Sequence, residues 1–174
     1  MQLSIRAAEP EDAGAIAGIL NAVIDEGVYT VFDTPFSVEE ERRYIESFPK
    51  RGVFLVAVRQ LDQQIVGFQS LEPFASYTHA FDHVGVMGTY VAAAQRRQGV
   101  AAALFESSFE AARRKGFEKI FTFVRGDNPA ALAAYCNHGF QVIGTARRQA
   151  KIRGAYVDEI LIEKFLQQEG NGHG

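Results

Sequence analysis

The chain has 174 residues, 47% of them hydrophobic and 22% charged, which is ordinary for a folded globular protein with one core. Its formal net charge of −3 gives no overall basic footprint for nucleic acid, and no apolar run approaches the roughly 20 residues that a membrane helix needs. Cys136 is the only cysteine, so an intrachain disulfide and a cysteine metal cluster are excluded. We therefore expect a cytoplasmic protein without a metal.

The first third of the chain predicts one strand and then two helices. Residues 3–6 alternate between apolar and polar, the period of a half-buried strand. Apolar residues recur with helical spacing over 13–24, directly after a proline and two acids that suit a helix N-terminus. The segment 26–36 loses this period and is rich in aromatic residues, which indicates a loop or a bent helix. Ser37 opens a capping-box pattern, which predicts a second helix over about 38–48.

The middle of the chain predicts three strands, a long helix and a fourth strand. The apolar runs 53–58 and 65–71 flank a short polar turn and therefore predict a hairpin. Residues 84–91 read as the next strand. Apolar residues at helical spacing predict a helix over 101–115, and alternation predicts a strand over 119–124.

The last part of the chain predicts a short helix and two strands. Asn128 and Pro129 suit the N-cap and first helical position, and Gly139 suits the end of that helix. Strands are predicted at 140–143 and 156–165, with a frayed tail over 167–174.

Together these elements predict a single α/β (α+β) domain over residues 1–166. Their order is β-α-α-β-β-β-α-β-α-β-β, which gives a mixed, mostly antiparallel central sheet of about seven strands flanked by about four helices. Cys136 is expected to be a small buried residue of the last helix.

The segment Arg96-Arg97-Gln98-Gly99-Val100-Ala101 lies between a strand and an alanine-rich helix. A helix N-terminus presents unpaired N–H groups and a partial positive charge, so it can hold an anion. Gly99 permits a close backbone approach, and the two arginines add positive potential. The same residues fit an ordinary turn with exposed arginines. A Walker-type loop is excluded because no Gly-Lys-Ser/Thr follows, and the single glycine is a poor dinucleotide fingerprint.

A second segment, residues 128–140, ends its helix in Gly-Phe before a strand, and the two segments together resemble the GNAT superfamily of N-acetyltransferases. The order of strands and helices is similar over about residues 3–165. The residues that match the family signature are Arg96, Gly99 and Ala101 in the first segment and Asn128, Tyr135, Gly139 and Phe140 in the second.

The resemblance implies an enzyme that moves an acetyl group from acetyl-CoA, as co-substrate, to an amine without a metal. Its central strands would splay apart around the pantetheine arm. Tyr135 would protonate the departing thiolate; the alternative is a tyrosine that only packs its ring against the sheet. The residues implied to bind the cofactor are Thr89, Tyr90, Val91, Arg96, Arg97, Gln98, Gly99, Val100, Ala101 and Asn128.

The general base is not evident, because the strand 84–91 lacks the glutamate that many relatives carry there. Histidine is a common general base at neutral pH, so His83 is the predicted catalytic base, although it also fits a loop histidine with no role. Proton loss to water would need no base. The other acids near the predicted strand ends are Glu72, Asp82, Asp158 and Glu159.

The acceptor pocket is expected in the least regular segments, 26–36, 73–83 and 147–156, the last of which is basic. The N-terminal half and residues 154–159 are similar to the phosphinothricin and methionine-sulfoximine acetyltransferase branch, so we expect a small amino acid or amino-acid-like amine. The alternatives are a protein N-terminal or ribosomal-protein acetyltransferase, a non-catalytic acyl-CoA-binding module and a glycine-turn nucleotide binder. Dimerisation is common among relatives, so a homodimer is possible. We expect neither nucleic acid nor a membrane as a partner.

Overall fold

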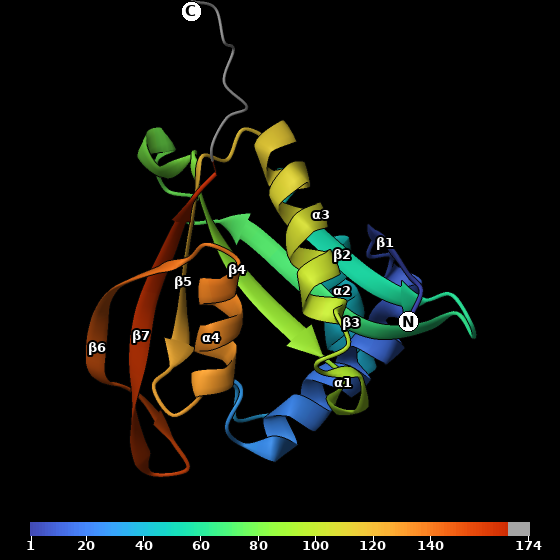
Figure 1. Cartoon of the computed structure of the whole chain (residues 1–174), viewed down its shortest axis with the longest axis horizontal. Helices are drawn as coiled ribbons and strands as arrows, with labels where there is room; N and C mark the ends of the chain where they lie inside the picture. Colours follow the sequence, from blue (N-terminus) through green and yellow to red (C-terminus); the bar gives the residue numbers. More distant parts are fainter. Residues whose placement is uncertain (167–174) are drawn as a thin grey trace, which may run out of the picture.

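The computed structural model describes residues 1–166, which form one seven-stranded sheet with four α-helices packed on its faces (Figure 1). The sheet order is β1-β2-β3-β4-β5-β7-β6, and every neighbouring pair is antiparallel except β4 and β5. The predicted fold class is confirmed. The strands are β1 (Leu3–Ala7), β2 (Val53–Arg59), β3 (Gln64–Pro73), β4 (Val84–Val91), β5 (Lys119–Arg125), β6 (Gln141–Ile152) and β7 (Ala155–Phe165). The helices are α1 (Ala13–Glu26), α2 (Val38–Glu46), α3 (Val100–Arg114) and α4 (Pro129–Asn137).

The predicted caps start two of the four α-helices, α2 and α4. The Ser37 hydroxyl accepts from the Glu40 N–H, and the Glu40 carboxylate accepts from the Ser37 N–H, so the capping box of α2 is complete. Asn128 caps α4 by accepting from the Ala131 N–H at 3.1 Å. A short 3₁₀ turn over 10–12 leads into α1, and Pro10 occupies the first position of that turn.

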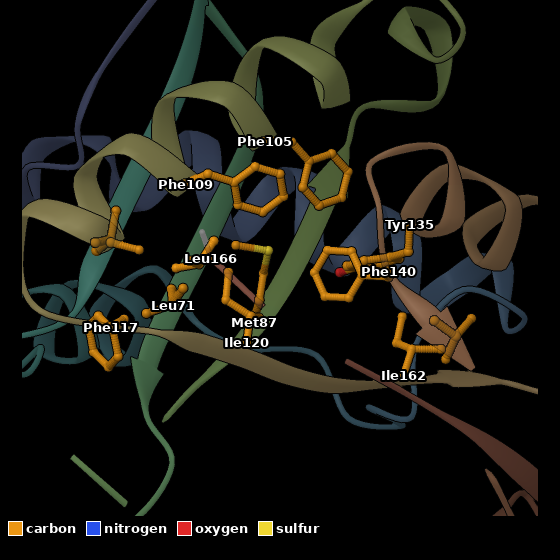
Figure 2. Packing of buried hydrophobic residues seen from close by; sticks show 13 residues of the cluster. Leu71, Met87, Phe105, Phe109, Phe117, Ile120, Tyr135, Phe140, Ile162 and Leu166 are labelled. Atoms are coloured by element: carbon orange, nitrogen blue, oxygen red, sulfur yellow. The ribbon is translucent and has the colours of Figure 1, made fainter. Parts of the chain in front are cut away.

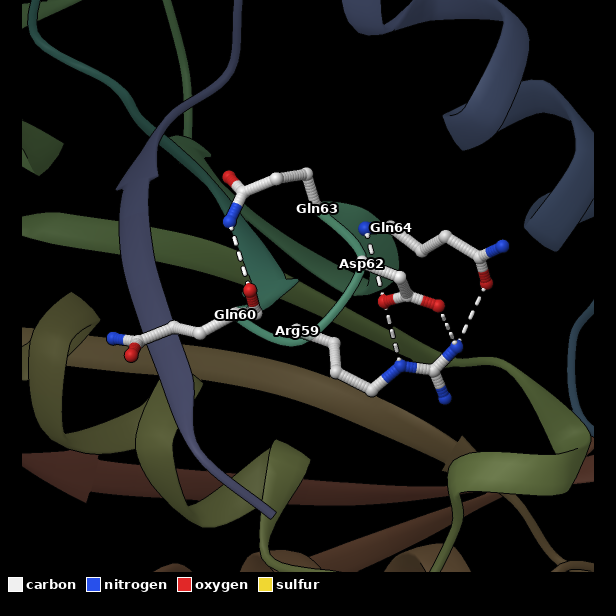
Figure 3. A network of polar contacts seen from close by, with 5 residues as sticks. All are labelled: Arg59, Gln60, Asp62, Gln63 and Gln64. Carbon is white, nitrogen blue, oxygen red and sulfur yellow. Dashed lines mark hydrogen bonds and ion pairs between the residues drawn. The ribbon is translucent and has the colours of Figure 1, made fainter.

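The hairpin between β2 and β3 is closed by side chains as well as by the backbone (Figure 3). The Arg59 guanidinium donates to both carboxylate oxygens of Asp62, at 2.8 and 2.6 Å, and to the Gln64 side chain. Gln63 adopts a left-handed backbone with φ of 58°, which tightens the turn. The short polar turn predicted here is therefore confirmed.

Each face of the sheet carries its own hydrophobic cluster. On one face α3 and α4 cover the strands, and Phe105 and Phe109 of α3 pack with Tyr135 and Phe140 (Figure 2). On the other face α1 and α2 pack through a second cluster that includes Ile16. Strand β2 serves both faces because its side chains alternate in direction.

Two details differ from the sequence prediction. The basic segment 147–156 was expected to be a loop after a strand ending at residue 143, but β6 continues to Ile152 and pairs with β7. Pairing with β7 stabilises the strand although the local sequence only weakly favours one. The Arg148 guanidinium also lies over the Tyr156 ring, 4.0 Å from its centre. Cys136 is exposed rather than buried. The predicted tail 167–174 lies outside the described residues, within which no helix is long and apolar enough to cross a bilayer.

Candidate active site

The two parallel central strands separate part of the way along the sheet. The ladder between β4 and β5 covers only three residue pairs, from Val84 with Lys119 to Val86 with Phe121. Beside its end, the buried Thr122 hydroxyl donates to the Met87 carbonyl at 2.6 Å. Beyond that bond no pairing joins β4 to β5. The C-terminal half of β4 therefore keeps backbone groups on the β5 side that a ligand can use.

Two cavities meet where the strands separate. One, of about 760 Å³, is lined by residues of the loop after α1, by α2 and by β3, β4 and β5; we call it the acceptor-side cavity. The other, of about 890 Å³, is lined by the turn before α3 and by α3, α4 and β4; we call it the phosphate-side cavity. The residues that line both cavities are Tyr29, Thr89, Tyr90, Asn128, Ala131 and Tyr135.

The turn before α3 has the geometry of an anion cradle. Arg97 and Gly99 both have left-handed backbones, with φ of 59° and 84°, and Gly99 is the N-cap residue of a 15-residue helix. No backbone hydrogen bond within residues 1–166 uses the N–H groups of residues 97–101. All six residues of the turn, 96–101, line the phosphate-side cavity. Unused N–H groups at a helix N-terminus are typical of an anion-binding turn.

The sequence predicted that the Arg96 side chain adds positive potential to the turn, but in the structure this side chain is paired with an acid. Its guanidinium donates to both carboxylate oxygens of Glu26, at 2.7 and 2.6 Å, and lies 4.3 Å from the Tyr29 ring centre. The hydrogen bonds from Arg96 hold the pKa of Glu26 below its usual range. Arg96 therefore joins the end of α1 to the turn before α3. The groups of the turn that stay available to a ligand include the backbone N–H groups of residues 97–101.

Tyr135 is buried at the junction of the two cavities and is linked to the sheet by a polar chain. Its hydroxyl oxygen lies 3.0 Å from Thr89 Oγ1, which accepts from the Gln69 side-chain N–H at 2.7 Å. Burial raises the pKa of Tyr135, so the phenol stays protonated at neutral pH. Gln69 is fully buried, and its Oε1 has no partner among the described residues. Sequence reasoning missed Gln69, whose only signal was a polar residue inside an apolar strand.

The other cofactor-binding residues predicted on β4 point to different places. Thr89 faces Tyr135, whereas Tyr90 stacks on Phe68 in the acceptor-side cavity with ring centres 4.9 Å apart. The Val91 carbonyl accepts from the Arg96 Nε–H at 3.3 Å. Asn128 is buried and lines both cavities, and its side-chain nitrogen makes no hydrogen bond within residues 1–166. Asn128 is therefore both a helix cap and a free donor at the junction.

His83 lies away from this junction. It is exposed, and its backbone carbonyl accepts from the N–H groups of Glu118 and Lys119, at the end of β4 where pairing with β5 begins. Thr89 is six strand residues further on, or about 20 Å at 3.3 Å per residue. His83 lines neither cavity. The predicted role of His83 as a base is incompatible with this position, because a general base must reach the proton it removes.

The acceptor-side cavity is built only partly by the segments expected from the sequence. The loop 29–36 lines it as predicted, but the 73–83 segment contributes only its first two residues and the 147–156 segment none. Helix α2 was not predicted to line it, yet it supplies Glu40, Glu41 and Tyr44. The Tyr44 hydroxyl donates to the Glu72 carboxylate.

Arg125 lines the acceptor-side cavity and was also missed by sequence reasoning. Its guanidinium donates to both carboxylate oxygens of Asp127, at 2.8 and 2.7 Å, and to the carbonyls of Gly27 and Thr30, both at 2.9 Å. The side chain is 7% exposed, so its contacts lie largely out of water. Arg125 thus holds the loop after α1 in place.

Two ligands, one in each cavity, would both reach the Tyr135 hydroxyl. Such an arrangement is typical of an enzyme that transfers a group from a donor to an acceptor. Comparison with known proteins gives the family: the model of the acetyltransferase (GNAT) family matches residues 16–140. The chain belongs to this family, and it is an acetyl-CoA-dependent N-acetyltransferase. Within residues 1–166 no group of three or more His, Cys, Asp or Glu side chains is placed to hold a metal ion.

Individual relatives match nearly the whole chain. A phosphinothricin N-acetyltransferase of Streptomyces coelicolor is 25% identical over 167 residues, which cover 95% of this chain and 97% of that protein. The structure of a ribosomal-protein-alanine N-acetyltransferase from Brucella melitensis matches with a TM-score of 0.86 and 25% identity, covering 93% and 99% of the two chains. A phosphinothricin acetyltransferase from Sinorhizobium meliloti, solved in complex with AcCoA, has a TM-score of 0.88 at 20% identity, covers 100% and 93%, and shows the shared fold.

Proposed function

We propose that this N-acetyltransferase binds acetyl-CoA and a small primary amine together and transfers the acetyl group by direct attack of the amine. The observation that supports this is the shared wall of the two cavities, at which Thr89, Asn128 and Tyr135 border both. The pyrophosphate would lie against the N–H groups of residues 97–101, and the pantetheine arm would follow the unpaired edge of β4. Holding two substrates at one junction lowers the barrier through proximity.

The residues at the junction can perform the proton transfers of this reaction. The amine would enter from the acceptor-side cavity and attack the thioester carbonyl, giving a tetrahedral oxyanion that a backbone N–H near Val91 stabilises. Tyr135 would donate its proton to the departing thiolate and regain one from the nitrogen of the intermediate. Its raised pKa keeps this proton available throughout the neutral range.

The acceptor we propose is a small amino acid or amino-acid-like compound. The name of the Streptomyces coelicolor relative, a phosphinothricin N-acetyltransferase, supports this class. A second candidate is the N-terminal amine of a protein, which the name of the Brucella melitensis structure favours. The size of the acceptor-side cavity, about 760 Å³, suits a whole small molecule.

We further propose a cytoplasmic homodimer, supported by exposed apolar side chains on β6 and β7 such as Ile143 and Phe165.

The deciding experiment is a thiol-release assay with acetyl-CoA and a panel of phosphinothricin, methionine sulfoximine, glutamate, simple alkyl and aryl amines, and short peptides. Thiol release with one of the small amines supports the proposal. Release only with peptides would favour the second candidate. Tight binding of acetyl-CoA, measured by calorimetry, without release for any amine would make the chain an acyl-CoA-binding module. Size-exclusion chromatography with light scattering tests the dimer.

A further inference from the structure

Glu41 is a buried carboxylate that lines the acceptor-side cavity without a partner. It lies on α2 and is only 4% exposed. Within residues 1–166 its carboxylate makes no hydrogen bond and no ion pair, whereas the carboxylate of the neighbouring Glu40 is held by the Ser37 cap. Burying an ionised carboxylate without a partner is costly, and burial raises the pKa of Glu41. A cationic ligand in the cavity would supply the missing partner.

The cavity offers Glu41 no cation of its own. Its only arginine or lysine within the described residues is Arg125, whose guanidinium already serves Asp127 and two backbone carbonyls. On the 3₁₀ turn that packs against α2, Asp12 is paired with Arg6 at 2.7 Å. The remaining titratable groups that line the cavity are Tyr29, Glu40, Tyr44, Glu72, Tyr90 and Tyr135. The charged groups left unneutralised are therefore acidic.

Strand β4 supplies no acidic side chain to this cavity. On the acceptor-side face β4 presents Val86 and Tyr90, and Val86 is directly opposite Glu72 of β3. The Glu72 carboxylate accepts a hydrogen bond from Tyr44, so it has a partner. Glu41 lies close enough to Tyr90 for its charge to add to burial in raising the pKa of that tyrosine. Tyr90 follows Thr89, so Glu41 faces the part of β4 next to the junction.

We propose that Glu41 binds the ammonium group of the acceptor in this cavity and takes its proton before attack. The proposal rests on the proposed function. One N–H proton passes to the Glu41 carboxylate, the neutral amine forms the C–N bond of the tetrahedral intermediate, and collapse of that intermediate breaks the C–S bond. Tyr135 protonates the thiolate and recovers a proton from the nitrogen. The proton on Glu41 leaves to solvent, so one ammonium and one thioester give one amide, one thiol and one proton.

The ammonium site can be tested without any turnover. The probe is 2-phenylethylamine, a primary ammonium on an aromatic body that suits this cavity, compared with the isosteric neutral 2-phenylethanol. Calorimetry at pH 7.5 should show the ammonium binding at least roughly tenfold more tightly than the alcohol, because both can donate a hydrogen bond to the carboxylate but only the ammonium adds the attraction of an opposite charge. Glu41→Gln should remove this difference, and Glu39→Gln, an exposed acid on the same helix, should keep it. Equal binding of the two probes by the unaltered protein, or a difference that persists in Glu41→Gln, would overturn the proposal.

Kinetics with the best amine of the panel tests the proton transfer. The plot of kcat/KM against pH should fall on its acid side, since Glu41 must be ionised to act. The apparent pKa of this acid limb should lie above about 4.3, the ordinary value for glutamate. Glu41→Gln should lower kcat/KM by roughly a hundredfold or more and abolish this limb, with an unchanged affinity for acetyl-CoA as proof of folding. If Glu41→Gln keeps the wild-type rate and limb, Glu41 is not the base although the enzyme assignment stands. If no amine releases thiol even with the unaltered protein, the proposed function fails, and the probe experiment alone decides the ammonium site.

Discussion

The hydroxyl oxygens of Thr89 and Tyr135 lie 3.0 Å apart, although the two residues are 46 positions apart in the chain. Thr89 Oγ1 accepts from the buried Gln69 amide at 2.7 Å, so its own proton can be donated to the Tyr135 oxygen. The Tyr135 proton is then free to point into the junction of the cavities. A donor to the Tyr135 oxygen also stabilises the tyrosinate that remains after proton transfer, which opposes the effect of burial on its pKa.

Replacing Tyr135 with phenylalanine removes the proposed acid and leaves the ring packing with Phe105 and Phe140. We expect kcat for thiol release to fall by roughly a hundredfold and the affinity for acetyl-CoA to stay within about twofold. Because burial raises the pKa of Tyr135, the acid stays protonated through neutral pH, and the loss should be the same from about pH 6 to pH 9. Steady-state kinetics with calorimetry checks this, and an unchanged kcat would assign Tyr135 a packing role alone.

Thr89→Val removes the hydroxyl that joins Gln69 to Tyr135, and Thr89→Ser keeps it. We expect the valine variant to lose about 1–3 kcal/mol of unfolding free energy, because a buried amide donor loses its acceptor. Its kcat should fall by roughly tenfold, less than the full effect of losing a general acid. Urea denaturation and thiol release measure the two effects. The serine variant should stay close to wild type; if valine and serine behave alike, the polar chain has no role.

Gly67 on β3 sets the distance between the sheet and the first turn of α3. A Cβ there would lie 2.9 Å from Val100 Cγ1 and 3.0 Å from the Tyr90 carbonyl oxygen. Gly67→Ala should therefore displace the start of α3, lowering stability by about 1–3 kcal/mol and weakening acetyl-CoA binding. The matched control is Gly18→Ala on α1, where the new methyl group meets nothing within 4 Å and should stabilise by about 0.5–1 kcal/mol. Equal acetyl-CoA affinities in both variants would contradict the prediction.

Glu41 should make the free protein less stable at neutral pH. A carboxyl whose pKa is raised on folding contributes stability below its unfolded pKa and loses it as the pH rises through the folded pKa. Glu41→Gln is therefore expected to raise Tm by a few degrees at pH 7, since about 1 kcal/mol corresponds to roughly 2–4 °C in a domain of this size. The gain should shrink at pH 4, where Glu41 is protonated. A lower Tm for the variant at pH 7 would mean that the carboxylate has a stabilising partner.

The phosphate side of the site could be predicted from sequence because its determinants are local. The left-handed backbone at Gly99 and the cap formed by Asn128 depend on residues within one turn of helix. The acceptor side could not be predicted in the same way. His83 is next to β4 in sequence but far from Tyr135 along the strand. Glu41 lies more than 40 residues before β4, and its local sequence gave no sign that it is buried.

What the sequence by itself determined is the order of strands and helices, the caps of α2 and α4 and the glycine turn before α3, because hydrophobic periodicity and capping act over a few residues. The tertiary structure alone decided where β4 leaves β5, which hydroxyl and amide meet at Tyr135, that Arg96 pairs with Glu26, and that Glu41 is buried in the acceptor-side cavity. These relationships join residues far apart in the chain. They arise from the packing of α1 and α2 on one face of the sheet and α3 and α4 on the other, which no local pattern encodes.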